Sequence, residues 1–287
     1  VAERDRLVSL AAPFTAAPVE MGRTAWRFSS IQWTTAGVAL ITENDRPTRM
    51  TRTWLAEPSP GNPEGLPPQK GLPPRKLWER SSEDSYGNPG TPLRVPRGSD
   101  AEAVLQVGDS IYLTGVGSSP DGDRPFLDRL DLKTLKTERL FRCPEKTYES
   151  VITPLDDEAK TLLTEYETPA DPPNYYARNL AAGTKRALTQ FKDPAPQLAG
   201  VAKQFVTYQR KDGVKLSGTL YLPPGYKKGE RLPMLMWAYP REFTDTDTAS
   251  QVAGSPYRFT RVSGTSHLFL LTQDEFRGKI VFLVRLA

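Results

Sequence analysis

The chain has 287 residues, enough for one large or two ordinary domains, and its 38% hydrophobic and 25% charged residues are a globular rather than a disordered mixture. Its 38 basic and 34 acidic residues leave a net charge of only +4, and the charges are interspersed, so nucleic-acid binding gains no support. The 27 prolines and 21 glycines disfavour long helices and favour short strands joined by many turns.

Cysteine and histidine each occur once, as Cys143 and His267, which excludes an internal disulfide and the usual multi-ligand metal sites. We expect Cys143 to be a small buried residue and His267 to be structural, within a helix over 266–272. No segment approaches the run of about 20 apolar residues that crosses a membrane, and the N-terminus lacks the pattern of a signal peptide. We therefore expect no metal, no cofactor and no membrane partner, while the compartment stays open.

Three stretches of the first two hundred residues read as repeats of four short strands, rich in apolar and β-branched residues. The predicted strands are 30–33, 39–43, 52–55 and 76–78 in the first repeat, 103–106, 111–115, 126–130 and 139–141 in the second, and 150–153, 161–165, 175–180 and 186–188 in the third. Four strands recurring at about 40 to 50 residues are typical of propeller blades. The alternative is a β-sandwich with accidental internal similarity.

Three blades do not close a ring, because propellers typically have about four to eight. We therefore expect either further blades elsewhere or a partner that supplies them, and exposed blade edges that favour self-association. Seven prolines interrupt the first repeat within 57–74, which is best read as an extended surface insertion.

After the third repeat the composition changes. Residues 193–197 read Asp-Pro-Ala-Pro-Gln, and we expect a partial propeller over 1–193, a linker over 194–200 and an incomplete second domain over 201–287. Residues 204–210 and 214–223 form a predicted hairpin around Asp212-Gly213. The apolar run 234–239 predicts a central strand covered on both faces by helices, so the second domain reads as the opening of an α/β fold.

These residues also carry a family resemblance. The matching motifs are Lys211-Asp212-Gly213, Gly-Thr-Leu-Tyr-Leu-Pro at 218–223, Leu232-Pro233, Trp-Ala-Tyr-Pro-Arg-Glu-Phe at 237–243, and Ser-Gly-Thr-Ser-His-Leu-Phe-Leu-Leu-Thr-Gln at 263–273. Together they resemble the entry into the catalytic domain of prolyl-oligopeptidase-type serine peptidases, and most closely the glutamyl-endopeptidase-like branch. The resemblance implies a propeller followed by an α/β-hydrolase domain.

The resemblance also implies two site residues. Tyr239 would donate its hydroxyl to the oxyanion of the tetrahedral intermediate, where negative charge develops only as the nucleophile adds. Arg241 would bind an acidic substrate side chain or a peptide terminus. The alternatives are a structural tyrosine at 239 and pairing of Arg241 with Glu242 or Asp245.

The chain contains no Gly-x-Ser-x-Gly nucleophile elbow. Ser118 lies in a predicted blade loop, Ser255 lacks the second glycine, and His267 precedes any elbow, whereas the hydrolase order puts the base last. The sequence therefore predicts part of a serine peptidase that cleaves peptide substrates after glutamate, with Ser, Asp and His of the triad absent and this chain inactive alone. The alternative is a non-catalytic propeller module that binds another protein.

The last residues depart from the family pattern. Residues 279–285 read Lys-Ile-Val-Phe-Leu-Val-Arg and are able to form a strand beside 234–239. An altered reading frame, a vector-derived tail and an aggregation-prone edge strand are the alternatives.

Overall fold

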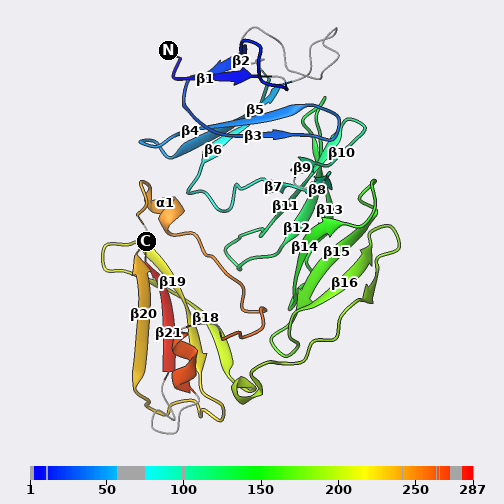
Figure 1. Ribbon diagram of the computed structural model, residues 1–287. Coiled ribbons are helices and arrows are strands. Elements are labelled where there is room, and N and C mark those ends of the chain that lie inside the picture. The colour runs from blue at the N-terminus through cyan, green and yellow to red at the C-terminus, as the bar shows by residue number, and fades with distance from the viewer. Residues whose placement is uncertain are drawn as a thin grey trace. The chain divides into compact units, whose positions relative to one another are not determined.

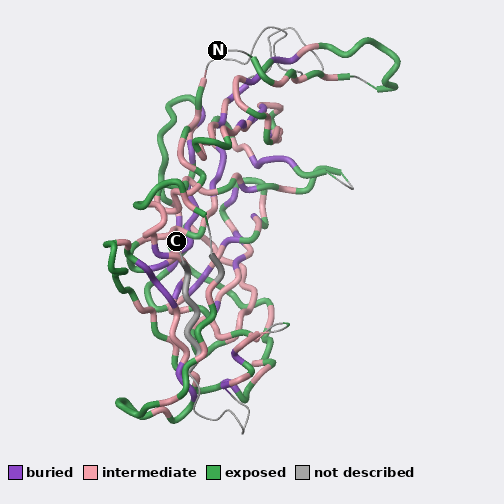
Figure 2. Tube along the Cα trace, turned by 90° about the vertical axis from the view of Figure 1, so that its left-hand side faces the viewer, coloured by how far each residue is buried: buried purple, intermediate pink, exposed green. Residues whose placement is uncertain are grey.

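The computed structural model describes residues 3–10, 12–56, 75–98, 101–240, 242–262, 264, 266–271 and 280–286. Strands dominate these residues and group into separate sheets (Figure 1). The chain divides into two compact units, Val1–Thr114 with Asp128–Arg139, and Gly115–Leu127 with Leu140–Ala287. Buried residues lie mainly within strands, and many turns between strands are exposed. Figure 2 colours the chain trace by this burial. The predicted insertion at 57–74 lies outside the described residues.

The first predicted repeat forms a four-stranded antiparallel sheet. Its strands, in sheet order, are β3 (Arg27–Trp33), β4 (Ala39–Asp45), β5 (Met50–Ala56) and β6 (Arg75–Ser81). Successive side chains of a strand point to opposite faces, so Ala39 and Ile41 of β4 lie on one face and Leu40 on the other. All three are at most 2% exposed, and they belong to two different apolar clusters. The sheet is therefore buried on both faces at β4, as in a blade stacked between neighbours.

The second repeat lies largely in the first unit. Its sheet has the order β10 (Gln106–Val107), β11 (Ser110–Gly115), β12 (Phe126–Asp131) and β13 (Thr137–Arg142), and β7 (Thr91–Pro92) also pairs with β11. The predicted strand 103–106 is split, because β9 (Ala101–Val104) pairs instead with β8 (Arg94–Arg97). Leu105 lies between β9 and β10, and its amide donates to the Leu93 carbonyl at 2.9 Å. At this residue the chain passes from the β8–β9 sheet to the sheet of the second repeat.

Two further sheets come before and after these two repeats in the order of the chain. A hairpin that the sequence did not predict, β1 (Asp5–Ser9) with β2 (Val19–Thr24), precedes the first blade. The third repeat forms the sheet β14 (Tyr148–Pro154), β15 (Thr161–Glu167), β16 (Asn174–Asn179) and β17 (Thr184–Ala187) within the second unit. Three successive antiparallel sheets, two of four strands and one of five, confirm the expected partial propeller.

The last sheet in the chain, which we call the fourth sheet, has four strands in mixed orientation and begins with the predicted hairpin. Its order is β18 (Ala202–Gln209), β19 (Lys215–Leu222), β21 (Ile280–Leu286) and β20 (Met234–Pro240). β19 pairs in antiparallel fashion with both β18 and β21, whereas β20 and β21 run parallel. A parallel pair needs a long crossover connection, which 241–279 provides, so an α/β sheet begins here. The C-terminal segment is thus a strand inserted between β19 and β20.

The expectation that 234–239 forms a central, doubly covered strand is wrong for the described chain. β20 lies at an edge of its sheet, and Met234 and Met236 are 56% and 55% exposed. An apolar run marks a strand suited to burial, but it does not itself supply the elements that cover it.

The helices of the described chain are short. They are the single turn α1 (Thr246–Ala249) and the 3₁₀ helices η1 (Pro196–Leu198) and η2 (His267–Leu271). Leu268 and Leu271 of η2 are buried against a small cluster that includes Tyr221 of β19, so η2 packs on the fourth sheet (Figure 1). None of these helices has the length or the apolar run that crossing a bilayer requires. The proposed boundaries at 193 and 201 stay a prediction.

Candidate functional site

The two predicted site residues lie at the end of β20. Tyr239 is the penultimate residue of this strand and is in register with Arg285 of β21. The side chain of Tyr239 and the whole of Arg241 lie outside the described residues. The roles of the Tyr239 hydroxyl and the Arg241 guanidinium therefore stay predictions.

The backbone position of Tyr239 is nevertheless informative. β20 and β21 run parallel, so their carboxyl ends meet at the same edge of the sheet. Open α/β sheets bind their ligands outside the carboxyl ends of their strands. A tyrosine one residue before the end of β20 is at this edge.

The serines and the histidine that the sequence singled out have other partners. The Ser118 hydroxyl donates to Asp123 at 2.7 Å, and the Ser255 hydroxyl accepts from the Tyr257 amide at 3.2 Å. The His267 ring packs on the Trp237 ring, with centroids 4.4 Å apart. These contacts are the ones that structural roles require, and they do not form a nucleophile with a base.

Cys143 is fully buried. Its sulfur accepts from the Glu149 amide at 3.1 Å, and burial raises the pKa of the thiol. A thiol that is buried and protonated is a poor nucleophile. No cluster of potential metal ligands occurs among the residues that the structure describes.

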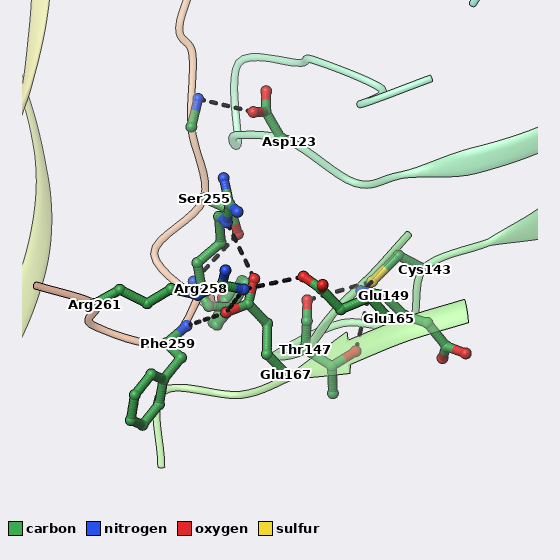
Figure 3. Close-up of polar contacts among 12 residues, drawn as sticks. Asp123, Cys143, Thr147, Glu149, Glu165, Glu167, Ser255, Arg258, Phe259 and Arg261 are labelled. Atoms are coloured by element: carbon green, nitrogen blue, oxygen red, sulfur yellow. Dashed lines mark hydrogen bonds and ion pairs between the residues drawn. The ribbon is translucent and has the colours of Figure 1, made fainter. Parts of the chain in front are cut away.

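A polar cluster that sequence reasoning missed joins the third blade to residues 254–261, which we call the docking segment (Figure 3). Glu167, the last residue of β15, is 1% exposed and accepts from the Phe259 amide at 3.0 Å. It also accepts from Arg258 Nε at 3.2 Å and from Arg261 Nη2 at 3.3 Å. Arg261 Nη2 donates in addition to Glu165 at 3.0 Å. A buried carboxylate is tolerated only when it is paired and hydrogen-bonded, and Glu167 is both.

The start of the docking segment is held by a second carboxylate. The Asp123 amide donates to the Gly254 carbonyl at 2.8 Å, and the Gly254 amide donates back to the Asp123 carboxylate at 3.0 Å. Gly122 precedes this contact with φ +101°, and a Cβ added there would lie 2.9 Å from the Gly254 carbonyl oxygen. The close backbone approach therefore requires glycine at 122.

The fourth sheet holds the other side of the docking segment. Lys203 of β18 donates from Nζ to the Arg258 carbonyl. Burial lowers the pKa of Lys203 to about 8, with a further lowering by Arg258 and an opposing effect of Glu167. The Arg258 guanidinium lies 4.7 Å from the centroid of the Tyr148 ring, at the first residue of β14.

These contacts have one consequence for the site. The docking segment follows Tyr239 and Arg241 in the chain and is bonded on one side to β15 and on the other to β18. The part of the chain that leaves the predicted site is thus anchored to the third blade. In the sequence this cluster is visible only as two acidic residues, Glu165 and Glu167, and as two arginines, Arg258 and Arg261. Neither pair indicates that it would contact the other.

The sequence is similar to two curated plant proteins. It is 38% identical over 263 residues to a probable chloroplastic glutamyl endopeptidase of Oryza sativa subsp. japonica, and 37% identical over 264 residues to the corresponding protein of Arabidopsis thaliana. Each match covers 86% of this chain. These matches confirm the resemblance drawn from the motifs at 211–243, although no protein-family model matches the chain. The chain spans 27% of the length of each plant relative.

Solved structures of prolyl oligopeptidase relatives support the fold. The chain matches dipeptidyl peptidase 4 of Porphyromonas gingivalis with a TM-score of 0.56 and 12% identity, over 98% of this chain and 34% of that one. It matches oligopeptidase B of Leishmania major with a TM-score of 0.53 and 11% identity, over 97% and 41%. At this identity the likeness concerns the fold alone.

Proposed function

We propose that this chain is the propeller-to-hydrolase portion of a serine peptidase that cleaves peptides after glutamate. The observation that carries the proposal is the 38% identity to a probable glutamyl endopeptidase over 86% of the chain. In this function Tyr239 donates to the oxyanion, and Arg241 binds the glutamyl carboxylate of the substrate. The docking segment keeps the chain after these residues in place against the third blade.

The 287 residues contain no nucleophile elbow, so we expect no catalysis from this chain alone. A fluorophosphonate probe should leave the purified chain unlabelled, and a glutamyl peptide should remain uncut. Turnover that persists in pure protein and disappears when one serine of the chain is replaced would contradict this expectation.

The roles of Tyr239 and Arg241 are testable in a full-length homologous enzyme, at the aligned positions. Tyr→Phe at position 239 should lower kcat by about 10²- to 10³-fold with a smaller change in KM, because the lost donor acts in the transition state. Arg→Ala at position 241 should reduce kcat/KM for a glutamyl peptide and spare its glutaminyl counterpart. An equal loss on both peptides would exclude a specificity role for Arg241.

The second candidate is a non-catalytic binding module, and the missing elbow is the observation that favours it. The two candidates differ in the full-length homologue, because a binding module would neither react with the fluorophosphonate probe nor cleave the peptide.

A further inference from the structure

The first blade carries a cavity of about 530 Å³ that plays no part in the proposed peptidase site. Four arginines line it, Arg4, Arg27, Arg46 and Arg49, and we call it the arginine pocket. A cavity of this size is in the range that binds small ligands or a short peptide segment. Four guanidinium groups around one cavity indicate an anionic ligand.

Backbone contacts fix the elements that present these arginines. Arg27 of β3 is the cross-strand neighbour of Asn44 on β4, and Asn44 is the neighbour of Thr51 on β5. The three residues therefore form a row across the sheet at the edge of the pocket. Near them, the Arg4 amide donates to the Thr24 carbonyl at 2.7 Å, which ties the N-terminal segment to β2.

The turn between β4 and β5 supplies the other two arginines. Arg49 has φ +58°, and its carbonyl accepts from the Ser82 amide at 2.7 Å and the Ser82 hydroxyl at 2.9 Å. A non-glycine residue in this conformation is held by its surroundings at some cost. Arg46 lies on the same turn, so the turn is fixed in the shape that lines the pocket.

The charges of the pocket are unbalanced. Arg49 has an ion pair with Glu83 at 3.4 Å, whereas Arg4, Arg27 and Arg46 have no ion pair with any residue that the structure describes. Elsewhere in the first unit, arginines such as Arg52 are paired with carboxylates. Cations that share a cavity without partners repel one another, and an anionic ligand relieves the repulsion.

The composition of the lining distinguishes among anions. Asp45 and Asn44 also line the pocket, so it offers side-chain oxygen acceptors for the N–H groups of a peptide. The described lining residues include no aromatic side chain on which a nucleobase could stack. The arginines come from three separate elements, which suits several carboxylates spaced along a chain better than one small anion.

We propose that the arginine pocket binds an acidic segment of a polypeptide through the carboxylates of successive side chains. This role concerns the first blade together with Arg4 of the N-terminal segment, and it does not depend on the proposed peptidase function. It assigns to the propeller a recognition site for acidic chains that is separate from the predicted site at Tyr239.

The test is fluorescence anisotropy of the purified chain with a labelled peptide of six glutamates, with a six-glutamine peptide as the uncharged reference. We expect binding of the glutamate peptide only, and weaker binding as NaCl is raised from 50 to 200 mM. The double variant R27A/R46A should weaken binding by about tenfold, since it removes two charged hydrogen-bond donors. The variant R27K/R46K keeps both positive charges but cannot form the paired hydrogen bonds of a guanidinium with a carboxylate, so it should retain part of the affinity.

The matched control is R97A/R186A, which removes the same charge from exposed residues outside the pocket. It should bind the glutamate peptide as the parent chain does. Equal losses in both double variants, or no binding of the peptide to folded protein at 50 mM NaCl, would overturn the site. Displacement of the peptide by inorganic pyrophosphate at lower concentration than by unlabelled peptide would overturn the ligand, since it would indicate a phosphate site.

Discussion

Replacing Glu167 with glutamine removes the charge that holds the docking segment and keeps the size of the side chain. Glu167 is buried and accepts from the Phe259 amide, Arg258 and Arg261. Removing one member of a fully buried ion pair costs about 3 to 5 kcal/mol. The side chains of Arg258 and Arg261 are 47% and 44% exposed, so water solvates them when the Glu167 charge is removed. We therefore expect E167Q to lower the free energy of unfolding of this region by about 2 kcal/mol.

Hydrogen exchange measures this cost where it arises. About 2 kcal/mol corresponds to roughly 30-fold more frequent opening, so the Phe259 amide should exchange about 30-fold faster in E167Q. The matched control is E165Q, because Glu165 is 23% exposed and shares only Arg261; its effect should stay below about threefold. Exchange over 254–262 that stays within about twofold of the parent chain in E167Q would refute the reasoning.

Three further predictions concern the same unit. Burial lowers the pKa of Lys203 to about 8, so the unfolded chain binds more protons between about pH 8 and 10 and stability should rise with pH across this window. K203M should reduce the slope of the unfolding free energy against pH by up to about 1 kcal/mol per pH unit. Urea unfolding at pH 8 and at pH 9.5 measures this slope. G122A should destabilise by about 1 to 3 kcal/mol in thermal unfolding, since its Cβ meets the Gly254 carbonyl, whereas G183A, also at positive φ but in open space, should cost less. E149Q should cost about 3 kcal/mol or more, because Glu149 is 0% exposed and receives two hydrogen bonds from Arg178; an effect below 1 kcal/mol would contradict this.

Patterns local in the chain predicted most of the strands. Every predicted blade strand except 103–106 lies in one strand of the structure or overlaps it, because alternation and turn residues act within a few residues. The hairpin around Asp212-Gly213 is present, with Gly213 at φ +92°. The β1–β2 hairpin was missed, since its strands are largely polar and give a weak alternating signal.

Of the two predicted site residues, the structure describes only the backbone of Tyr239, so it gives the position of Tyr239 in the sheet and nothing of its side chain. The motif at 237–243 carried the family resemblance, and its residues 237–240 form the end of β20, which runs parallel to β21. The strand order was beyond local patterns. Residues 279–285 were expected to be able to pair with 234–239, and β21 does pair with β20. Its place between β19 and β20, which leaves β20 at the edge of the sheet, was not predicted.

The amino-acid sequence by itself determined the strand repeats, the family and the absence of a nucleophile elbow from these 287 residues. Only the tertiary structure decided which charges meet: Glu167 with Arg258 and Arg261, more than 90 residues away, and Arg4 and Arg27 in one pocket with Arg46. Strand patterns depend on the period of neighbouring side chains, whereas ion pairs of this kind depend on where distant parts of the chain return, and that is set by packing.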